Sequence, residues 1–452
     1  MSKKNAIMLS FSDNYSFAAA NVLMSIRDNS PKLFDECEFI IYQDDLSEQN
    51  RNVLLKIRPG IRFMGMERHL PEYVYKNAKR WGSYITQKLH AFLLLNEYRR
   101  ILWLDCDVYV NKNLDYLFEI DCDIAYQNEA ISDPDHLADL VHKRFGSLVS
   151  DYRCMPFIIN EGVVVFNDSI NRFNITGDDI CRLAEEFGTV HSIFGGIDGS
   201  LILLIAYHYK MNCVELPEEY NMMPYNPDIY RSTIQHFHAA KPWQDEIIYM
   251  MFPKWGENHD KFVKLGGTNY PELHMNPKLV PKFDYSTSVI RSVSVLSPVF
   301  GSLDILKDPL FDLDFYRDQS CPRFYLKDMD HQLYIDVDVT PANQVAIDLV
   351  MRRRLRGKEN DRIFSDFLET ISDIPEKAEL TELRNHDLQI QLKYKEVEHT
   401  NLILNRIASY AKSRLTGLAR QASQRLKIYT NLMLGLIADV ADGTLHLLVF
   451  FA

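Results

Sequence analysis

Glycine is scarce in this chain, and the first one is Gly60. No glycine-rich loop can therefore follow the first apolar run, at residues 6–10. Dinucleotide-binding oxidoreductases and P-loop nucleoside triphosphatases use such a loop to bring the backbone close to phosphates. A sugar nucleotidyltransferase, which has a related α/β architecture, needs one at the same place. The lack of early glycine argues against all three classes.

Paired cysteines are also missing. The seven cysteines are scattered, and no two of them form a Cys-x-x-Cys motif. This pattern is typical of reduced thiols in the cytoplasm, and it disfavours a disulfide framework or a zinc site. Residues 1–11 are too short for a signal peptide and lack a small-residue cleavage pattern. We therefore expect a cytoplasmic protein.

The chain has no excess of positive charge, because its formal net charge is -12. We expect no nucleic-acid partner, since phosphate backbones attract basic surfaces. The one long apolar run, residues 432–451, is interrupted by Asp439, Asp442, Gly443 and His446. Carboxylates near the centre of a bilayer cost several kcal/mol, so this run predicts peripheral membrane contact at most.

Residues 401–430 contain no Asp or Glu but six Lys and Arg residues. A basic amphipathic helix of this kind suits the anionic cytoplasmic face of a membrane. It equally suits an acidic neighbour or partner, including oligomerisation through C-terminal helices. Both interpretations stay open.

The order of apolar runs predicts an α/β domain over residues 1–255. Strands are expected at residues 6–10, 38–42, 101–104, 124–127, 162–167 and 210–215, and helices at 16–27, 48–57, 85–97, 134–145, 171–187 and 199–207. Residues 256–345 are richer in Pro, Asp and Ser and predict a loop-rich accessory region. Residues 346–452 predict a helical extension, with a patchy apolar stripe too irregular for a coiled coil.

Two carboxylates follow the most apolar of these strands. The run Ile101-Leu-Trp-Leu104 is typical of a strand buried on both faces, and it leads directly into Asp105 and Asp107. Ligands of open α/β sheets bind beyond the carboxyl ends of such strands. Five other Asp-x-Asp pairs in the chain lack this context. Hard cations such as Mg²⁺ and Mn²⁺ bind through one or two carboxylates plus substrate phosphates, so this pair is a candidate nucleotide-diphosphate anchor.

Several further motifs occur in a fixed order along the chain. They are Ser12-Asp-Asn-Tyr15, Lys88-Leu-His90, Asp105-Cys-Asp107, Asn113-Leu-Asp-Tyr-Leu-Phe118, Asn160-Glu-Gly162, Gly195-Gly-Ile-Asp198-Gly and His236-Phe-His-Ala-Ala-Lys241-Pro-Trp243. Together they resemble glycosyltransferase family 8, which includes glycogenin and bacterial lipopolysaccharide hexosyltransferases. The resemblance spans about residues 4–245 and leaves the C-terminal part unexplained.

The resemblance implies a GT-A (Rossmann-like) fold, a mixed and mainly parallel sheet flanked by helices. It implies a divalent metal, Mn²⁺ or Mg²⁺, on Asp105, Asp107 and His236, with His238 a competing ligand. It assigns catalysis to Asp198 and Lys241. Donor binding falls to Ser10, Asn14, Tyr15, Lys88, Asp105, Cys106, Asp107, Asn160 and Lys241.

These residue types suit their implied roles. Tyr15 offers a flat face for a uracil ring, although a turn followed by an ordinary core aromatic is the plainer interpretation. Lys241 can neutralise a departing diphosphate as a point charge. Asp198 can stabilise positive charge at the anomeric carbon, or it can simply cap the helix that begins nearby. Pro242-Trp243 is expected to fix the loop rather than to act chemically.

Four departures from the family pattern affect donor identity and acceptor geometry. Ser12 replaces an acidic residue, Glu161 replaces a small one, and Gly199 follows Asp198 where a Gln is usual. The spacing from His236 to Lys241 is one residue short. The metal ligands are unaffected. The resemblance thus predicts a metal-dependent retaining hexosyltransferase that uses UDP-glucose or UDP-galactose and a glycan acceptor, such as a surface polysaccharide or a lipid-linked glycan. The alternative is a degenerate domain that serves as a scaffold or glycan-binding module.

Overall fold

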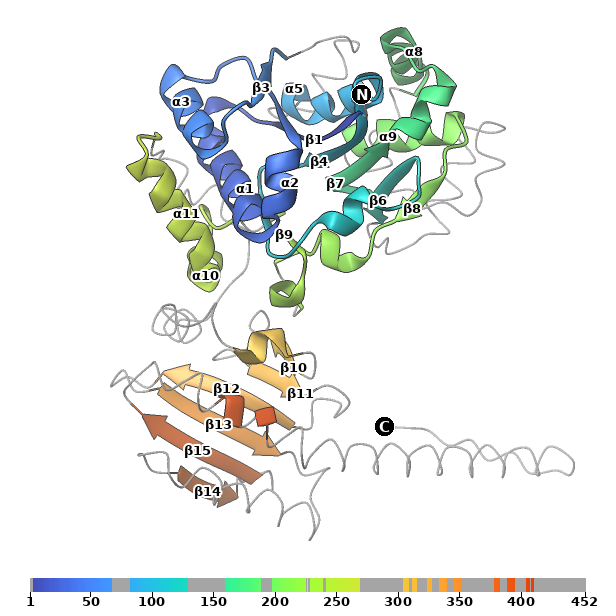
Figure 1. The fold of residues 1–452 in the computed structure, drawn as a ribbon. Coiled ribbons are helices and arrows are strands. Elements are labelled where there is room, and N and C mark those ends of the chain that lie inside the picture. Colours follow the sequence, from blue (N-terminus) through green and yellow to red (C-terminus); the bar gives the residue numbers. More distant parts are fainter. Residues whose placement is uncertain are drawn as a thin grey trace, which may run out of the picture. The chain divides into compact units, whose positions relative to one another are not determined.

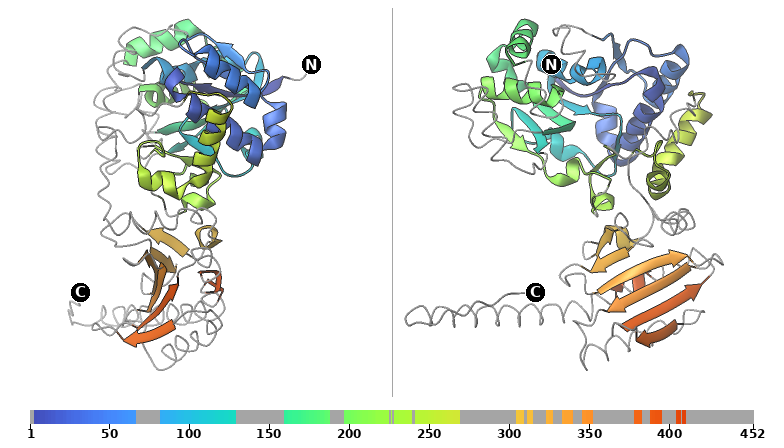
Figure 2. Two further views of the ribbon diagram at one scale, coloured as in Figure 1. Left: turned by 90° about the vertical axis from the view of Figure 1, so that its left-hand side faces the viewer. Right: turned by 180° about the vertical axis from the view of Figure 1, so that it is seen from behind.

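The computed structural model divides into two compact units, Met1–Lys282 and Phe283–Ala452, and each is described here by itself (Figures 1 and 2). In the N-terminal unit the structure describes residues 3–66, 82–128, 159–187, 197–224, 226, 228–238 and 241–268. In the C-terminal unit it describes residues 304–308, 311–314, 323–326, 333–339, 345–351, 378–382, 388–394, 404–406 and 408–409.

A seven-stranded sheet in the order β3-β2-β1-β4-β7-β6-β8 forms the centre of the N-terminal unit. Its strands are β1 (Lys4–Ser10), β2 (Glu38–Tyr42), β3 (Arg62–Met64), β4 (Tyr98–Leu104), β6 (Ile124–Asn128), β7 (Ile159–Asn167) and β8 (Cys213–Glu215). The strand β7 runs antiparallel to both of its neighbours, and the other pairs in the sheet are parallel. The predicted mixed, mainly parallel sheet is confirmed, and each of the six predicted strands is present.

Helices and short 3-10 turns connect these strands (Figure 1). The helices are α1 (Ser16–Asn29), α2 (Pro31–Glu36), α3 (Glu48–Ile57), α5 (Gly82–Ile85), α6 (Ala91–Leu94), α8 (Gly177–Phe187), α9 (Ile197–His208), α10 (Glu246–Met251) and α11 (Pro253–Lys264). The helix predicted at residues 48–57 is confirmed with its bounds, because Ser47 caps it by accepting from the backbone N–H of Asn50. The helix predicted at 85–97 is interrupted by the 3-10 helix Thr86–His90. The helix predicted at 134–145 lies outside the described residues.

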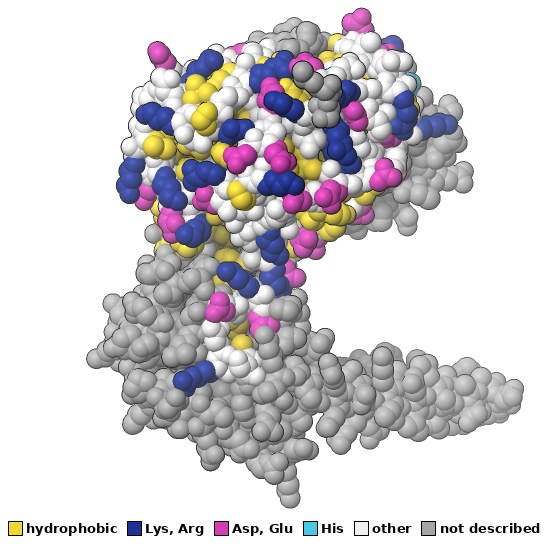
Figure 3. Space-filling view, in the orientation of Figure 1, with side chains coloured by type: hydrophobic (Ala, Val, Ile, Leu, Met, Phe, Trp, Pro, Cys, Tyr) yellow, Lys and Arg dark blue, Asp and Glu magenta, His cyan; other side chains and the backbone are white. Residues whose placement is uncertain are grey.

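Both faces of the sheet are buried. Ala6 and Met8 of β1 belong to a core cluster with residues of α6, α8 and α9, and the alternate residues Ile7 and Leu9 are equally inaccessible to solvent. Alternate side chains of a strand point to opposite faces, so the continuous apolar runs in the sequence are explained by two covered faces. On the surface shown in Figure 3, the described acidic and basic side chains of this unit are interspersed.

The N-terminal unit continues past the predicted boundary at residue 255. Helix α11 packs on α1, where Asn21 donates to the backbone oxygen of Trp255 (3.2 Å) and accepts from Asn258 (3.0 Å). All three side chains are buried. The segment after α11 returns to α3, since Thr268 N–H donates to the side chain of Asn50 (2.9 Å). A boundary at 255 would cut through α11, so that prediction is wrong.

The C-terminal unit contains a six-stranded sheet in the order β10-β11-β12-β13-β15-β14, antiparallel at every pair. Its strands are β10 (Phe311–Asp314), β11 (Arg323–Leu326), β12 (Leu333–Val339), β13 (Val345–Met351), β14 (Ala378–Glu382) and β15 (Leu388–Tyr394). Within the described residues, strands therefore occupy parts of the predicted loop-rich region and of the predicted helical extension. The segment Leu388-Gln-Ile-Gln-Leu-Lys-Tyr394 alternates apolar and polar residues, a period of two that indicates a strand.

The predictions for the end of the chain fall mostly outside the described residues. This holds for the apolar run at 432–451 and for nearly all of the basic stretch at 401–430, of which residues 404–406 and 408–409 are described as helix. Within the described part of the chain, no helix has the length and apolar character that crossing a bilayer requires.

We expect Trp255→Ala to destabilise the N-terminal unit by about 3–5 kcal/mol, as is usual for a large aromatic removed from a core. Trp255 is 1% exposed and stacks between Trp243 and His259. Urea unfolding followed by near-ultraviolet circular dichroism measures the loss. The exposed Tyr249→Ala serves as control and should cost far less; equal costs would contradict the packing described here.

Candidate active site

The site begins where β4 leaves the sheet. Asp105 follows the last strand residue, and its backbone N–H still donates to the oxygen of Gly162 on β7 (2.9 Å). The indole N–H of Trp103 donates to Asp105 Oδ1 (2.7 Å). Trp103 and Asp105 are two residues apart, so a strand directs both side chains to the same side. The first carboxylate is thereby fixed by the sheet itself.

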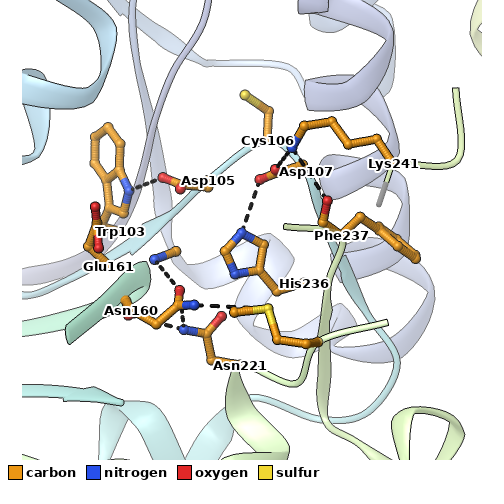
Figure 4. Close-up of polar contacts among 12 residues, drawn as sticks. Trp103, Asp105, Cys106, Asp107, Asn160, Glu161, Asn221, His236, Phe237 and Lys241 are labelled. Carbon is orange, nitrogen blue, oxygen red and sulfur yellow. Dashed lines mark hydrogen bonds and ion pairs between the residues drawn. The ribbon is translucent and has the colours of Figure 1, made fainter. Parts of the chain in front are cut away.

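A second, two-stranded sheet places the other metal-ligand candidates. The strands β5 (Val108–Val110) and β9 (Ile234–His236) pair antiparallel with Val108 opposite His236. Phe237 N–H donates to the backbone oxygen of Asp107 (2.8 Å), and His236 Nε2 lies 3.3 Å from Asp107 Oδ1. The pairing register therefore brings the imidazole to the carboxylate (Figure 4).

The three predicted metal ligands converge. Asp105, Asp107 and His236 each offer one ligand atom, and these atoms lie within 4.8 Å of one another. His236 is 2% exposed, and its Nδ1 has no hydrogen-bond partner among the described residues. Two carboxylate oxygens and one imidazole nitrogen form a donor set that suits a divalent cation completed by phosphate oxygens, so the residues fit the implied metal.

Gly162 is what lets the imidazole reach this position. A Cβ built on Gly162 would lie 2.3 Å from His236 Cε1 and 2.6 Å from its Nδ1. Real Cβ atoms do not approach other atoms so closely, so the histidine ring occupies the space that a side chain at 162 would need.

Lys241 forms an ion pair with Asp107 through its Nζ, which also lies 3.4 Å from the backbone oxygen of Phe237. Burial alone would raise the pKa of Asp107, but Lys241 and His236 outweigh it and hold the pKa of this carboxyl well below its usual range. Asp107 is therefore ionised, as a metal ligand must be.

Lys88 neutralises the other side of the site. Its Nζ lies 2.6 Å from Asp198 Oδ2 and 3.6 Å from Asp105 Oδ1, and it donates to the backbone oxygen of Glu161 (3.3 Å). Its side chain is 1% exposed. Burial by itself lowers the pKa of Lys88, yet the carboxylates of Asp105, Asp198 and Glu161 together raise it above its ordinary value. The lysine is therefore charged although it is buried.

Asp198 lies in the first turn of α9 and is 1% exposed. Its described contact is the ion pair with Lys88, and a carboxylate in the first turn also suits the helix dipole. This arrangement supports Asp198 as the residue that orients Lys88. Its predicted contact with the reacting sugar stays a prediction.

The predicted donor-binding residues at the end of β1 lie beside the carboxylate loop. The thiol of Cys106 donates to the backbone oxygen of Ser10 (3.6 Å), and Ser10 Oγ lies 3.7 Å from the sulfur of Met66. Burial, with the charges of Asp107 and Asp105, raises the pKa of the Cys106 thiol. Cys106 is therefore a neutral thiol that links the two strand ends.

Asn14 and Tyr15 form the 3-10 turn after β1. Asn14 accepts from the hydroxyl of Ser12, and the ring of Tyr15 is 9% exposed, with its centroid 5.9 Å from that of Trp243. Lys241 Nζ lies 5.6 Å from the same indole. Trp243 thus connects the turn to the metal ligands, as expected of a residue that fixes the loop.

Asn160 is held by a residue that the sequence does not reveal. Its Oδ1 accepts from Gly162 N–H (3.2 Å) and from Asn221 Nδ2 (2.9 Å), and the same Nδ2 reaches its backbone oxygen (3.1 Å). No motif marks Asn221, because it meets Asn160 only in the folded chain. Trp103 is also absent from the predicted set, although its spacing from Asp105 signals a shared side. His238 is exposed, with its ring 5.6 Å from that of His236, and it lies outside the three-ligand cluster.

A comparison with protein families identifies the family of this chain. The model of glycosyl transferase family 8 matches residues 6–246, more than half of the chain. The chain belongs to glycosyltransferase family 8. It is therefore a glycosyltransferase, and the mixed sheet with flanking helices is the GT-A fold that the motifs implied. No curated protein sequence matches the chain.

Solved structures of low sequence identity resemble this family 8 chain. One is the galactosyltransferase LgtC in complex with donor and acceptor sugar analogs, at 18% identity, covering 59% of this chain and 98% of that one, with a TM-score of 0.43. The bifunctional glycosyltransferase WbbM has 15% identity over 59% of this chain and 52% of its own, with a TM-score of 0.40. The glycosyltransferase GlyE of Streptococcus pneumoniae TIGR4 has 15% identity over 59% and 66%, with a TM-score of 0.35.

We expect Lys88→Met to lower the free energy of unfolding by about 3–5 kcal/mol at pH 8, because it leaves Asp198 buried without its counter-ion. Chemical denaturation measures this loss.

The double variant Lys88→Met/Asp198→Leu should recover most of the loss. Exposed Lys254→Met is the matched control. A deficit that persists in the double variant would contradict the ion pair.

Proposed function

We propose that this family 8 enzyme transfers a hexose from UDP-glucose or UDP-galactose to a glycan acceptor with retention of anomeric configuration. The observation that carries the proposal is the convergence of Asp105, Asp107 and His236 at the carboxyl end of β4. The family implies a nucleotide-sugar donor and a glycan acceptor. The identity of the sugars and the stereochemical outcome are our proposals.

The proposed metal ligands are Asp105, Asp107 and His236. A divalent cation held there would act as a Lewis acid toward the leaving diphosphate. The imidazole nitrogen favours Mn²⁺ over Mg²⁺, because Mg²⁺ prefers an all-oxygen shell and Mn²⁺ binds nitrogen ligands more strongly. The low pKa of Asp107 keeps this ligand deprotonated, so no proton has to be released when the cation binds.

Lys241 is the proposed charge-neutralising group for the departing UDP. In transfer, the bond between the anomeric carbon and the diphosphate oxygen breaks, a bond to an acceptor hydroxyl oxygen forms, and the proton of that hydroxyl passes to the departing diphosphate or to water. The Lys241 ammonium lies on Asp107, beside the place where the diphosphate charge develops. Because Lys241 is held there before reaction, no reorganisation is needed when the leaving group gains charge.

The remaining predicted contacts divide between the nucleoside and the sugar. We propose that the turn of Asn14 and Tyr15 receives the uridine, since it is linked through Trp243 to Lys241. Ser10 and Cys106 border the same strand end. Asn160 would line the sugar pocket next to His236, and Lys88 with Asp198 would fix the Asp105 side of the diphosphate.

The C-terminal part of the chain would determine where in the cell the enzyme acts. We propose a cytoplasmic enzyme that extends a surface polysaccharide or a lipid-linked glycan, with its basic stretch at 401–430 on the membrane face or on an oligomer partner. That stretch contains six Lys and Arg residues and no Asp or Glu, a charge pattern that supports either role.

Metal-linked nucleotide binding is the sharpest test of the proposal. Isothermal titration of UDP should show at least about tenfold tighter binding with Mn²⁺ than with a chelator, and Asp105→Ala, Asp107→Ala and His236→Ala should each remove this difference. Asp121→Ala, which alters an exposed member of another Asp-x-Asp pair, is the matched control. Metal-independent binding in the parent would favour a degenerate scaffold or glycan-binding module instead.

Lys241→Met should lower the turnover number by about 10- to 100-fold, the usual value of a charge-assisted contact, and leave Mn²⁺-dependent UDP binding within about tenfold. Release of UDP from a panel of nucleotide sugars measures turnover. Lys254→Met should match the parent. A variant with unchanged turnover and weakened UDP binding would place the lysine in ground-state binding only.

A further inference from the structure

The side chain of Glu161 lies across the beginning of α9. A Cβ built on Gly199 would lie 3.1 Å from Glu161 Oε2 and 3.2 Å from Ile159 Cγ1. Such distances are tighter than ordinary van der Waals contact, so the carboxyl uses space that a side chain at position 199 would take. Glu161 on β7 and Gly199 on α9 are thus sterically matched.

Glu161 also borders the Asp105 side of the metal site. Lys88 donates to its backbone oxygen (3.3 Å) and lies 3.6 Å from Asp105 Oδ1. Figure 4 shows the glutamate next to Trp103 and Asp105. A diphosphate bound by Asp105, Asp107 and His236 carries its sugar directly on the outer phosphate. The sugar must therefore lie within a few ångströms of these ligands, in the neighbourhood of Glu161.

Among the described residues on this side, the carboxyl of Glu161 is an acidic group without an ion-pair partner. Asn160 Oδ1 already accepts two hydrogen bonds, from Gly162 and Asn221. Asp198 is 1% exposed and paired with Lys88. Glu161 is half-buried, and its carboxyl has no ion pair within the described part of the chain, although the Lys88 charge acts on it. Burial, and then the charge of Asp198, raise the pKa of Glu161 well above its ordinary value.

We propose that Glu161 contacts the transferred sugar of the donor, hydrogen-bonding its hydroxyl groups from the space that Gly199 leaves open. This inference rests on the proposed use of a nucleotide sugar. A carboxyl group suits the task because its two oxygens can engage neighbouring hydroxyls. Glu161 is in this way a specificity-determining residue, distinct from the metal ligands that hold the diphosphate.

Comparing UDP with UDP-sugars isolates this contact. With Mn²⁺ present, isothermal titration of UDP, UDP-glucose, UDP-galactose and UDP-N-acetylglucosamine is performed on the parent, Glu161→Ala and Glu161→Gln. We expect Glu161→Ala to weaken the preferred UDP-sugar by about 3- to 30-fold, the value of one or two hydrogen bonds, and UDP by less than about twofold. Glu161→Gln retains hydrogen-bonding groups and should lose less. Glu215→Ala, an exposed glutamate at the end of β8, should match the parent.

The outcomes separate the two proposals. If UDP itself shows no Mn²⁺-linked binding to the parent, the proposed function fails. If UDP binds but Glu161→Ala weakens UDP and UDP-sugars equally, or weakens neither, the role of Glu161 is overturned while the proposed function stands. That role is likewise overturned if the parent binds UDP and UDP-sugars identically, because no sugar contact then contributes.

A double-mutant cycle of Gly199→Ala and Glu161→Ala tests the steric match between the two residues. Gly199→Ala should displace the Glu161 carboxyl and weaken the UDP-sugar about as much as Glu161→Ala does. In the Glu161→Ala background the same change should add less than about twofold, because the displaced group is already gone. Gly177→Ala is the matched control, since a Cβ there meets nothing within 4 Å. Additive losses in the double variant would overturn the pairing, and melting temperatures of all variants show whether the fold is kept.

Discussion

The site depends on the pairing of β5 with β9, two strands of three residues each. The main sheet fixes Asp105 through its backbone bond to Gly162, but it does not reach His236. The small sheet joins the two, because Phe237 N–H donates to the oxygen of Asp107. On the other side of β9, His236 N–H donates to the oxygen of Met222. These bonds are made by the backbone, so the position of the imidazole follows from the register and not from side-chain packing alone.

A lysine lies against the carboxylates on each side of this loop. Lys88 lies against Asp105 and Asp198, and Lys241 lies against Asp107. Buried ions are tolerated when they are paired, and removing one partner costs more than the pair contributes. The two lysines differ in access, since the Lys88 side chain is 1% exposed and that of Lys241 is 18% exposed. Lys88 is therefore the more enclosed counter-ion, and Lys241 is the more accessible of the two lysines.

The central strands and the candidate metal ligands were predictable because each has a local signal. Apolar runs mark β1, β2 and β4, and the ordered motifs single out Asp105, Asp107 and His236. The strands β5 and β9 are too short for a periodic signal, and Asn221 meets Asn160 only through the fold. Leucine spacing favoured helix where the C-terminal unit has strands, although the alternation at 388–394 indicated otherwise. Glu161 and Gly199 each stood out as departures, but their contact joins a strand to a distant helix and leaves no trace in either segment.

The candidate metal site depends on residue 162 being a glycine. The imidazole of His236 fills the volume in which even a methyl group at 162 would have to sit. The position of this candidate ligand on β9 therefore depends on the lack of a side chain at position 162 on β7. Any side chain at position 162 would collide with the ring at 236, so a residue on β7 limits its own identity to glycine for the sake of a side chain on β9.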